Sequence, residues 1–96
     1  MMLNKLPTDV RQYIQEKFTQ SEIEEVGERW QIIYKEIGTR FLRAVVYLAE
    51  GQVDAIDTYL KFLEKNNKDI LDWAENDEKN RKIRDFSKTF QENGLL

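Results

Sequence analysis

The sequence predicts an all-α protein, folded as an up-and-down bundle of four core helices with a loosely docked fifth helix at the C-terminus. Its 96 residues include one proline and four glycines, which leaves few turn-forming residues for a protein of many strands. Apolar residues recur at intervals of three and four over long stretches, which is the period of an amphipathic helix. Apolar residues make up 41% of the chain and charged residues 34%, as in a folded domain with a strongly charged surface.

The first half of the chain predicts three helices. A helix of about 7–18 repeats an apolar residue every four positions. Thr19 and Glu22 have the spacing of a capping box, which ends this helix and begins the next. The second helix reaches Gly38. The third, 39–50, is apolar over more than half of its circumference, which is typical of a central, buried helix.

A single amphipathic helix of about 52–75 is expected next, with an apolar half that would contact two other helices. Asn67 falls on this apolar half, where a hydrophobic residue would be expected. A polar residue there can fix helix register or an oligomeric state, and a kink or a partly exposed site explains it equally well. Trp73 lies at the edge of the same half, where aromatic residues are usually core. We also take Asn67 and Trp73 as candidate partner-binding residues.

We interpret residues 1–96 as one helical domain, with a core of 6–75 and an amphipathic tail of 76–96. The tail has three large apolar residues before its glycine, which are Ile83, Phe86 and Phe90. Their spacing permits a short helix of about 78–92. Burying them would contribute about 5–8 kcal/mol, whereas ordering the backbone costs about 1–2 kcal/mol for each residue. We therefore expect the tail to dock loosely and to use these three residues for partner binding.

Two residue types are missing from the composition. The chain has no cysteine and no histidine, which removes the thiolate nucleophile, cysteine-based metal sites and the commonest general base. We therefore predict that the protein is not an enzyme and needs no cofactor. Its apolar runs are too short to span a bilayer and its first residues do not resemble a signal peptide, so we expect a cytoplasmic protein without membrane contact. The net charge of −3 disfavours a nucleic-acid partner.

An acidic pattern offers an alternative function. Glu24, Glu25 and Glu28 form E-E-x-x-E, and Asp54-x-x-Asp57 follows after an intervening helix. The pattern is similar to the magnesium-binding motif of the all-α MazG-like nucleotide pyrophosphohydrolases, with an aspartate at position 54 where that family has glutamate. The resemblance implies Mg²⁺ held by Glu25, Glu28 and Asp57. The same residues fall on the polar faces of their helices, which argues against a shared metal site and favours an ordinary solvated acidic surface.

Two further features of the surface remain. The tail concentrates basic residues, which are Lys79, Arg81, Lys82, Arg84 and Lys88. Acidic residues are interleaved with them, so a solvated mixed-charge segment competes with the second alternative, a nucleic-acid accessory protein. Ile32 is a lone apolar residue on the polar face of the second helix, which is ordinary in a soluble protein but can mark a partner-binding surface.

Four stretches of the chain resemble the motifs of a family of small bacterial all-helical proteins of unknown function. These stretches are Leu6–Arg11 (L-P-x-D-V-R), Phe18–Glu22, Arg43–Gly51 and Asp69–Glu75 (D-[IV]-L-x-W-A-E). The likeness covers about 6–75 and leaves the tail outside it. Asn67 and Lys68 depart from the pattern, because the family favours a tyrosine and an arginine there. The resemblance implies a bacterial helical domain and no particular activity.

Together these observations favour a non-enzymatic protein-interaction or regulatory module of the cytoplasm. Its partner would be an unknown protein or a second copy of the chain. The expected contact residues are Ile32, Asn67, Trp73, Ile83, Phe86 and Phe90.

Overall fold

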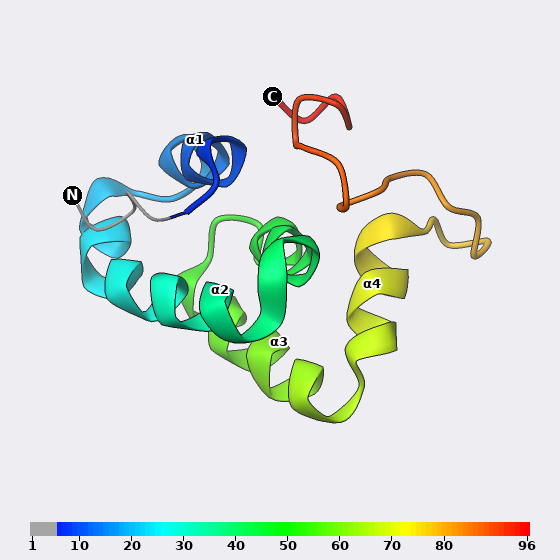
Figure 1. The fold of residues 1–96 in the computed structure, drawn as a ribbon, viewed down its shortest axis with the longest axis horizontal. Helices are drawn as coiled ribbons and strands as arrows, with labels where there is room; N and C mark the ends of the chain where they lie inside the picture. The colour runs from blue at the N-terminus through cyan, green and yellow to red at the C-terminus, as the bar shows by residue number, and fades with distance from the viewer. Residues whose placement is uncertain (1–5) are drawn as a thin grey trace.

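The structure of the chain, a computed structural model, describes residues 6–96, and for residues 25–36 it describes only the helical backbone. Its helices are α1 (Thr8–Lys17), α2 (Gln20–Leu48), α3 (Val53–Lys65) and α4 (Asn67–Glu75) (Figure 1). Two helical segments make up α2 and meet at Gly38, whose φ of 80° and ψ of 173° are not helical. The predicted all-α class and helical bundle are confirmed.

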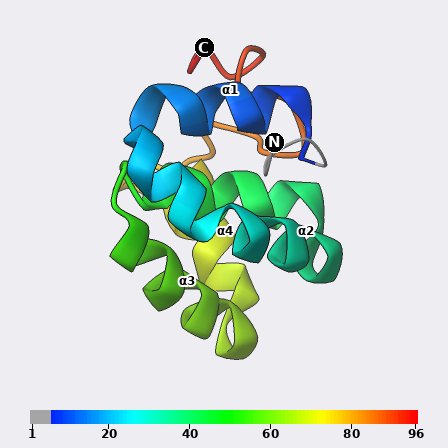
Figure 2. The ribbon, with the colours of Figure 1, turned by 90° about the vertical axis from the view of Figure 1, so that its left-hand side faces the viewer.

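The C-terminal segment of α2 forms the centre of the bundle. Helices α2, α3 and α4 pack against one another, and α1 packs on α2 (Figure 2). Five consecutive positions in the middle of this segment, 42–46, are buried. Four of them are apolar, namely Leu42, Ala44, Val45 and Val46, and the fifth is Arg43. The sequence-based prediction of a central, buried third helix is confirmed.

Local signals in the sequence set the boundaries between α1, α2 and α3. The Thr19 hydroxyl donates a hydrogen bond of 2.6 Å to Glu22 Oε1, within the predicted capping box at the start of α2. Gly51 follows α2 with a φ of 79°, and a Cβ there would collide with the backbone carbonyl oxygen of Lys17. Glycine is therefore required both by the left-handed backbone and by the close approach of α1.

The prediction of one helix over 52–75 is wrong. The chain breaks at Asn66, whose φ of −142° and ψ of 65° separate α3 from α4. Asparagine is a poor helix former because its short polar side chain competes for backbone hydrogen bonds. Asn67 is exposed as the first residue of α4 and does not occupy a core position. The polar residue in the apolar pattern therefore marks a turn, which lets α4 fold back onto α2 and α3 (Figure 1).

The prediction of a fifth helix over 78–92 is also wrong, because short polar side chains bind the backbone in its place. The Asp77 carboxylate accepts hydrogen bonds from the amides of Lys79 and Arg81. The Asp85 carboxylate accepts one from the Ser87 amide, and the Asn93 side chain bonds to both the amide and the carbonyl of Asp85. Such bonds stabilise turns in competition with the helix.

The tail is part of the core and does not dock loosely. Phe86 and Phe90 have no exposed surface. The Phe90 ring stacks on Tyr13 of α1 at 4.1 Å between centroids, and the Phe86 ring lies 5.3 Å from that of Tyr47 in α2. The C-terminal segment thus returns to α1 and fills the space beside it (Figures 1 and 2).

Two ion pairs anchor this returning segment. Arg43 of α2 binds the Asp9 carboxylate through two hydrogen bonds of 2.8 and 3.1 Å, and both residues are buried. One turn earlier, Arg40 binds the buried Glu75 at the end of α4 in the same way, at 2.7 and 3.0 Å. The backbone of Phe86 links the two ion pairs, because its amide donates to Glu75 and its carbonyl accepts from Arg43. These bonds satisfy buried polar groups of the tail that would otherwise be costly.

Candidate interaction surface

An exposed pair of aromatic side chains lies where α3 and α4 meet. The break at Asn66 folds the two helices against each other and brings Phe62 of α3 beside Trp73 of α4. Their rings contact edge to face, with centroids 5.4 Å apart and an interplanar angle of 77°. Phe62 is 43% exposed and Trp73 is 47% exposed. Exposure of two large rings in contact is unusual for a soluble domain and is typical of a binding surface.

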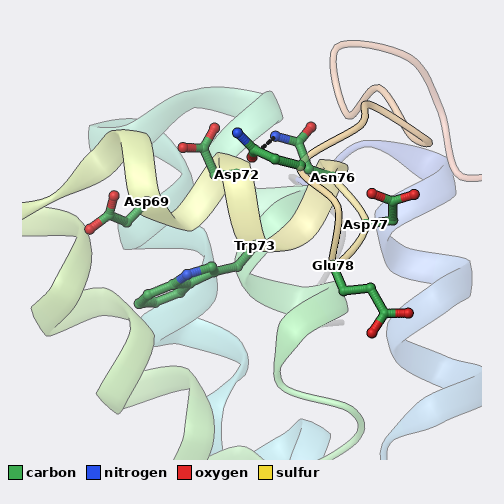
Figure 3. A pocket seen from close by; sticks show the side chains of 7 residues that line it. Asp69, Asp72, Trp73, Asn76, Asp77 and Glu78 are labelled. Atoms are coloured by element: carbon green, nitrogen blue, oxygen red, sulfur yellow. Dashed lines mark hydrogen bonds between the residues drawn. The ribbon is translucent and has the colours of Figure 1, made fainter.

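An acidic pocket borders Trp73. It encloses about 480 Å³ and is lined by four carboxylates together with Trp73, Asn76 and Asn80. Asp69 and Asp72 extend from α4 near Trp73, and Asp77 and Glu78 extend from the segment that follows (Figure 3). The indole forms the apolar wall of this otherwise polar hollow.

Only one of the four carboxylates that line this pocket forms an ion pair with another described residue. Asp77 is occupied within the chain, because it pairs with Arg81 at 2.9 Å. The Arg81 amide lowers the pKa of Asp77 more than the partial burial of its carboxyl raises it, and the Arg81 side chain lowers it further. Within the described part of the chain, Asp69, Asp72 and Glu78 form no ion pair. Their charge is therefore available to a partner.

A basic pocket borders Phe62 on α3. It encloses about 370 Å³ and is lined by Phe62, Lys61, Lys65 and Glu64. Lys61 and Lys65 are exposed, and neither forms an ion pair with any residue that the structure describes. The aromatic pair therefore adjoins both a positively charged hollow on α3 and a negatively charged hollow on α4.

The structure separates the predicted partner-binding residues. Trp73 lies on the surface just described, and Asn67 is exposed at the start of α4. Ile83 is 53% exposed in the tail. Phe86 and Phe90 cannot bind a partner in this structure because they are fully buried, so that prediction is wrong. The side chain of Ile32 lies outside the described residues.

The structure describes only one of the three acidic side chains expected to hold Mg²⁺ under the first alternative. Glu25 and Glu28 lie in the segment whose side chains are not described, and Asp57 is half-buried on α3. Among the residues whose side chains are described, no group of three or more acidic side chains is arranged so that it could hold a metal ion. This includes the carboxylates of the acidic pocket.

Several basic residues of the tail are engaged inside the molecule. Arg81 pairs with Asp77, and Arg84 donates to the Ala74 carbonyl while its guanidinium lies 4.6 Å from the centre of the Tyr47 ring. These contacts hold the tail against the rest of the molecule. Lys79 and Lys88 are exposed.

Sequence reasoning missed Phe62 and the buried charged residues Asp9, Arg43 and Glu75. Phe62 lies on the apolar half of the expected 52–75 helix, where aromatic residues are usually core, so the pattern gives no sign of its exposure. A signal for Arg43 was present, because an arginine between Leu42 and Ala44 of the most apolar helix needs a buried counter-ion. Nothing in the local sequence of Asp9 or Glu75 distinguishes them from ordinary helix-end acids.

Comparisons with family models, with curated proteins and with solved structures find no match. None of the helices in the described residues combines the length and apolarity needed to cross a membrane.

Proposed function

We propose that this chain is a non-enzymatic protein-interaction module whose contact surface is the aromatic patch, defined as Phe62 and Trp73 with the flanking Lys61, Lys65, Asp69 and Asp72. The observation that carries the proposal is the edge-to-face pair of rings, each more than 40% exposed. Tryptophan and other aromatic residues dominate the binding energy of protein interfaces, because they bury large areas and lose little conformational entropy. As part of the same proposal, we assign the module to the cytoplasm of a bacterium.

The aromatic patch predicts a specific loss of binding. Wild-type protein, the Phe62→Ser/Trp73→Ser double variant and an Ile83→Ser control are immobilised and exposed to a cell extract. Ile83 is the matched control, because it is at least as exposed as the two aromatic residues but belongs to the tail. We expect a partner that wild type and Ile83→Ser retain and the double variant loses. If all three baits retain the same proteins, the aromatic patch is not the contact surface.

The two alternative functions have less support in the described residues. No observation favours a nucleotide pyrophosphohydrolase, and the contacts of Arg81 and Arg84 leave the tail without a continuous basic face for nucleic acid. Addition of Mg²⁺ during thermal unfolding tests the first alternative, because a ligand that binds only the folded state raises the melting temperature.

A further inference from the structure

We propose that the partner of the aromatic patch is a second copy of this chain, bound across a two-fold axis that passes beside Phe62 and Trp73. The inference rests on the proposed function and names its partner. In a two-fold interface the same surface of each copy meets the other in reversed orientation. Such a surface must therefore complement itself.

The opposite charges beside the two rings can meet this requirement. Phe62 borders the pocket of Lys61 and Lys65, whereas Trp73 borders the pocket of Asp69 and Asp72. Since the two rings are in contact, the basic and the acidic hollow adjoin the same aromatic pair. In the proposed dimer, a rotation of 180° about an axis beside the rings places the lysines of one copy opposite the aspartates of the other. The aromatic side chains of both copies then meet at the centre.

A partner segment that carries charges of only one sign fits this surface less well. A basic segment would be attracted by Asp69 and Asp72 but repelled by the two lysines, and an acidic segment would meet the opposite conflict. Glu64 reduces the charge of the basic hollow without reversing it. Because neither the lysines nor these aspartates form an ion pair within the described part of the chain, no intramolecular contact has to break before they pair across the interface.

The area of the patch shows why the charged residues must take part. The exposed portions of the two rings amount to about 200 Å². A standard interface covers about 800 Å² on each partner, or about one-seventh of the 5919 Å² surface of this molecule. The rings can therefore supply the buried centre of the interface, while the flanking residues of α3 and α4 supply its charged rim.

Charge reversal in the full-length chain tests the two-fold pairing. Sedimentation equilibrium is measured on wild type, on Lys61→Glu/Lys65→Glu and on Asp69→Lys/Asp72→Lys across the micromolar range. We expect wild type to dimerise, and each reversal to raise the dissociation constant at least about tenfold, because like charges then face each other twice in the dimer. An equimolar mixture of the two variants should recover dimers, since reversed lysines of one meet reversed aspartates of the other.

A charge-reversal variant outside the aromatic patch serves as the control. Glu16→Lys/Lys88→Glu reverses two exposed charges outside the patch and should leave the wild-type dissociation constant unchanged. Circular dichroism checks that each variant keeps its helices. The inference is overturned if wild type remains monomeric, if neither reversal weakens the dimer, or if the mixture of folded variants does not reassociate. A monomeric wild type that still binds an extract protein through Phe62 and Trp73 would overturn the homodimer and leave the proposed function standing.

Discussion

Asp9 and Arg43 lie 34 residues apart and form a buried, two-bonded ion pair between α1 and α2. The same carboxylate accepts a hydrogen bond of 3.0 Å from the Phe90 amide, and the same guanidinium donates one of 3.0 Å to the Phe86 carbonyl. One ion pair therefore joins three parts of the molecule, which are the first helix, the central helix and the tail. Removing either partner should affect all three.

Asp9→Asn should destabilise the protein strongly. The substitution preserves the size of the side chain but leaves the Arg43 guanidinium buried without a counter-ion. Breaking a buried ion pair in this way costs about 3–5 kcal/mol. Urea denaturation followed by circular dichroism measures the change in the free energy of unfolding. The double variant Asp9→Asn/Arg43→Met should lose less than the sum of the two single losses, and strictly additive losses would show that the pair is not energetically coupled.

The stability of the protein should fall in acid because of the same carboxylate. Burial alone would raise the pKa of Asp9, but hydrogen bonds from Arg43 and from the Phe90 amide outweigh it and lower the pKa below the ordinary 3.8. The unfolded chain titrates near that ordinary value. The contribution of the pair is therefore fully present above that pH and is lost as the pH falls through the lower pKa of the folded state.

Asp9→Asn should consequently show a smaller loss of stability than wild type on acidification below about pH 4. The other carboxyls with lowered pKa, including those of Glu22 and Asp85, are present in both proteins and cancel in the comparison. The measurement is the free energy of unfolding at a series of acidic pH values. Curves that remain parallel down to the lowest pH would contradict the assignment.

The sequence predicted those features of the fold that depend on local periodicity and capping. The capping box at Thr19 and the break at Gly38 were readable because each acts within a few residues. The break at Asn66 was not, since the apolar spacing of 52–75 continues through it as if the helix were unbroken. The local traces of the turn are Asn67, a polar residue in that pattern, and its neighbour Asn66, a poor helix former.

The tail was misjudged for a different reason. Counting its three large apolar residues omitted the polar groups that hold it. Asp9, Arg40 and Arg43 are distant from the tail in sequence, and Glu75, which directly precedes the tail, has no sequence signal for its bond to the Phe86 amide. Three of these residues, Asp9, Arg43 and Glu75, stand in the motifs on which the family resemblance was based. For the candidate site, Trp73 was among the predicted contacts. Phe62 was not, since its exposure depends on how α4 folds back after Asn66.

Gly51→Ala should destabilise the protein more than Gly94→Ala. Both glycines have a positive φ, 79° and 74°, so alanine is strained at either position by about 1–3 kcal/mol. At Gly51 the added Cβ also meets the Lys17 carbonyl, whereas at Gly94 no atom lies within 4 Å of it. Thermal unfolding of the two variants separates the steric contact from the backbone strain. Equal shifts in melting temperature would show that the approach of α1 to Gly51 does not constrain the fold.

Truncation after Asn76 should prevent the remaining chain from folding, in contrast to what the apolar content of the tail suggests. The truncation removes Phe86 and Phe90, and replacement of one buried phenylalanine by alanine already costs about 3–5 kcal/mol. It also deprives Asp9 and Glu75 of the tail amides that bind them. A domain of this size has a total stability of about 5–15 kcal/mol, so the combined loss is comparable with the whole.

Two finer measurements separate the buried residues of the tail from its exposed ones. The amides of Phe86 and Phe90 donate to buried carboxylates and should exchange with solvent as slowly as the amides in the C-terminal segment of α2. Phe90→Ala should lower the free energy of unfolding by about 3–5 kcal/mol, whereas Ile83→Ala, at a side chain that is 53% exposed, should change it by less than about 0.5 kcal/mol. A cooperative thermal transition for residues 1–76, or fast exchange at Phe86 and Phe90, would show that the tail is an appendage and that the two ion pairs stabilise the helices without it.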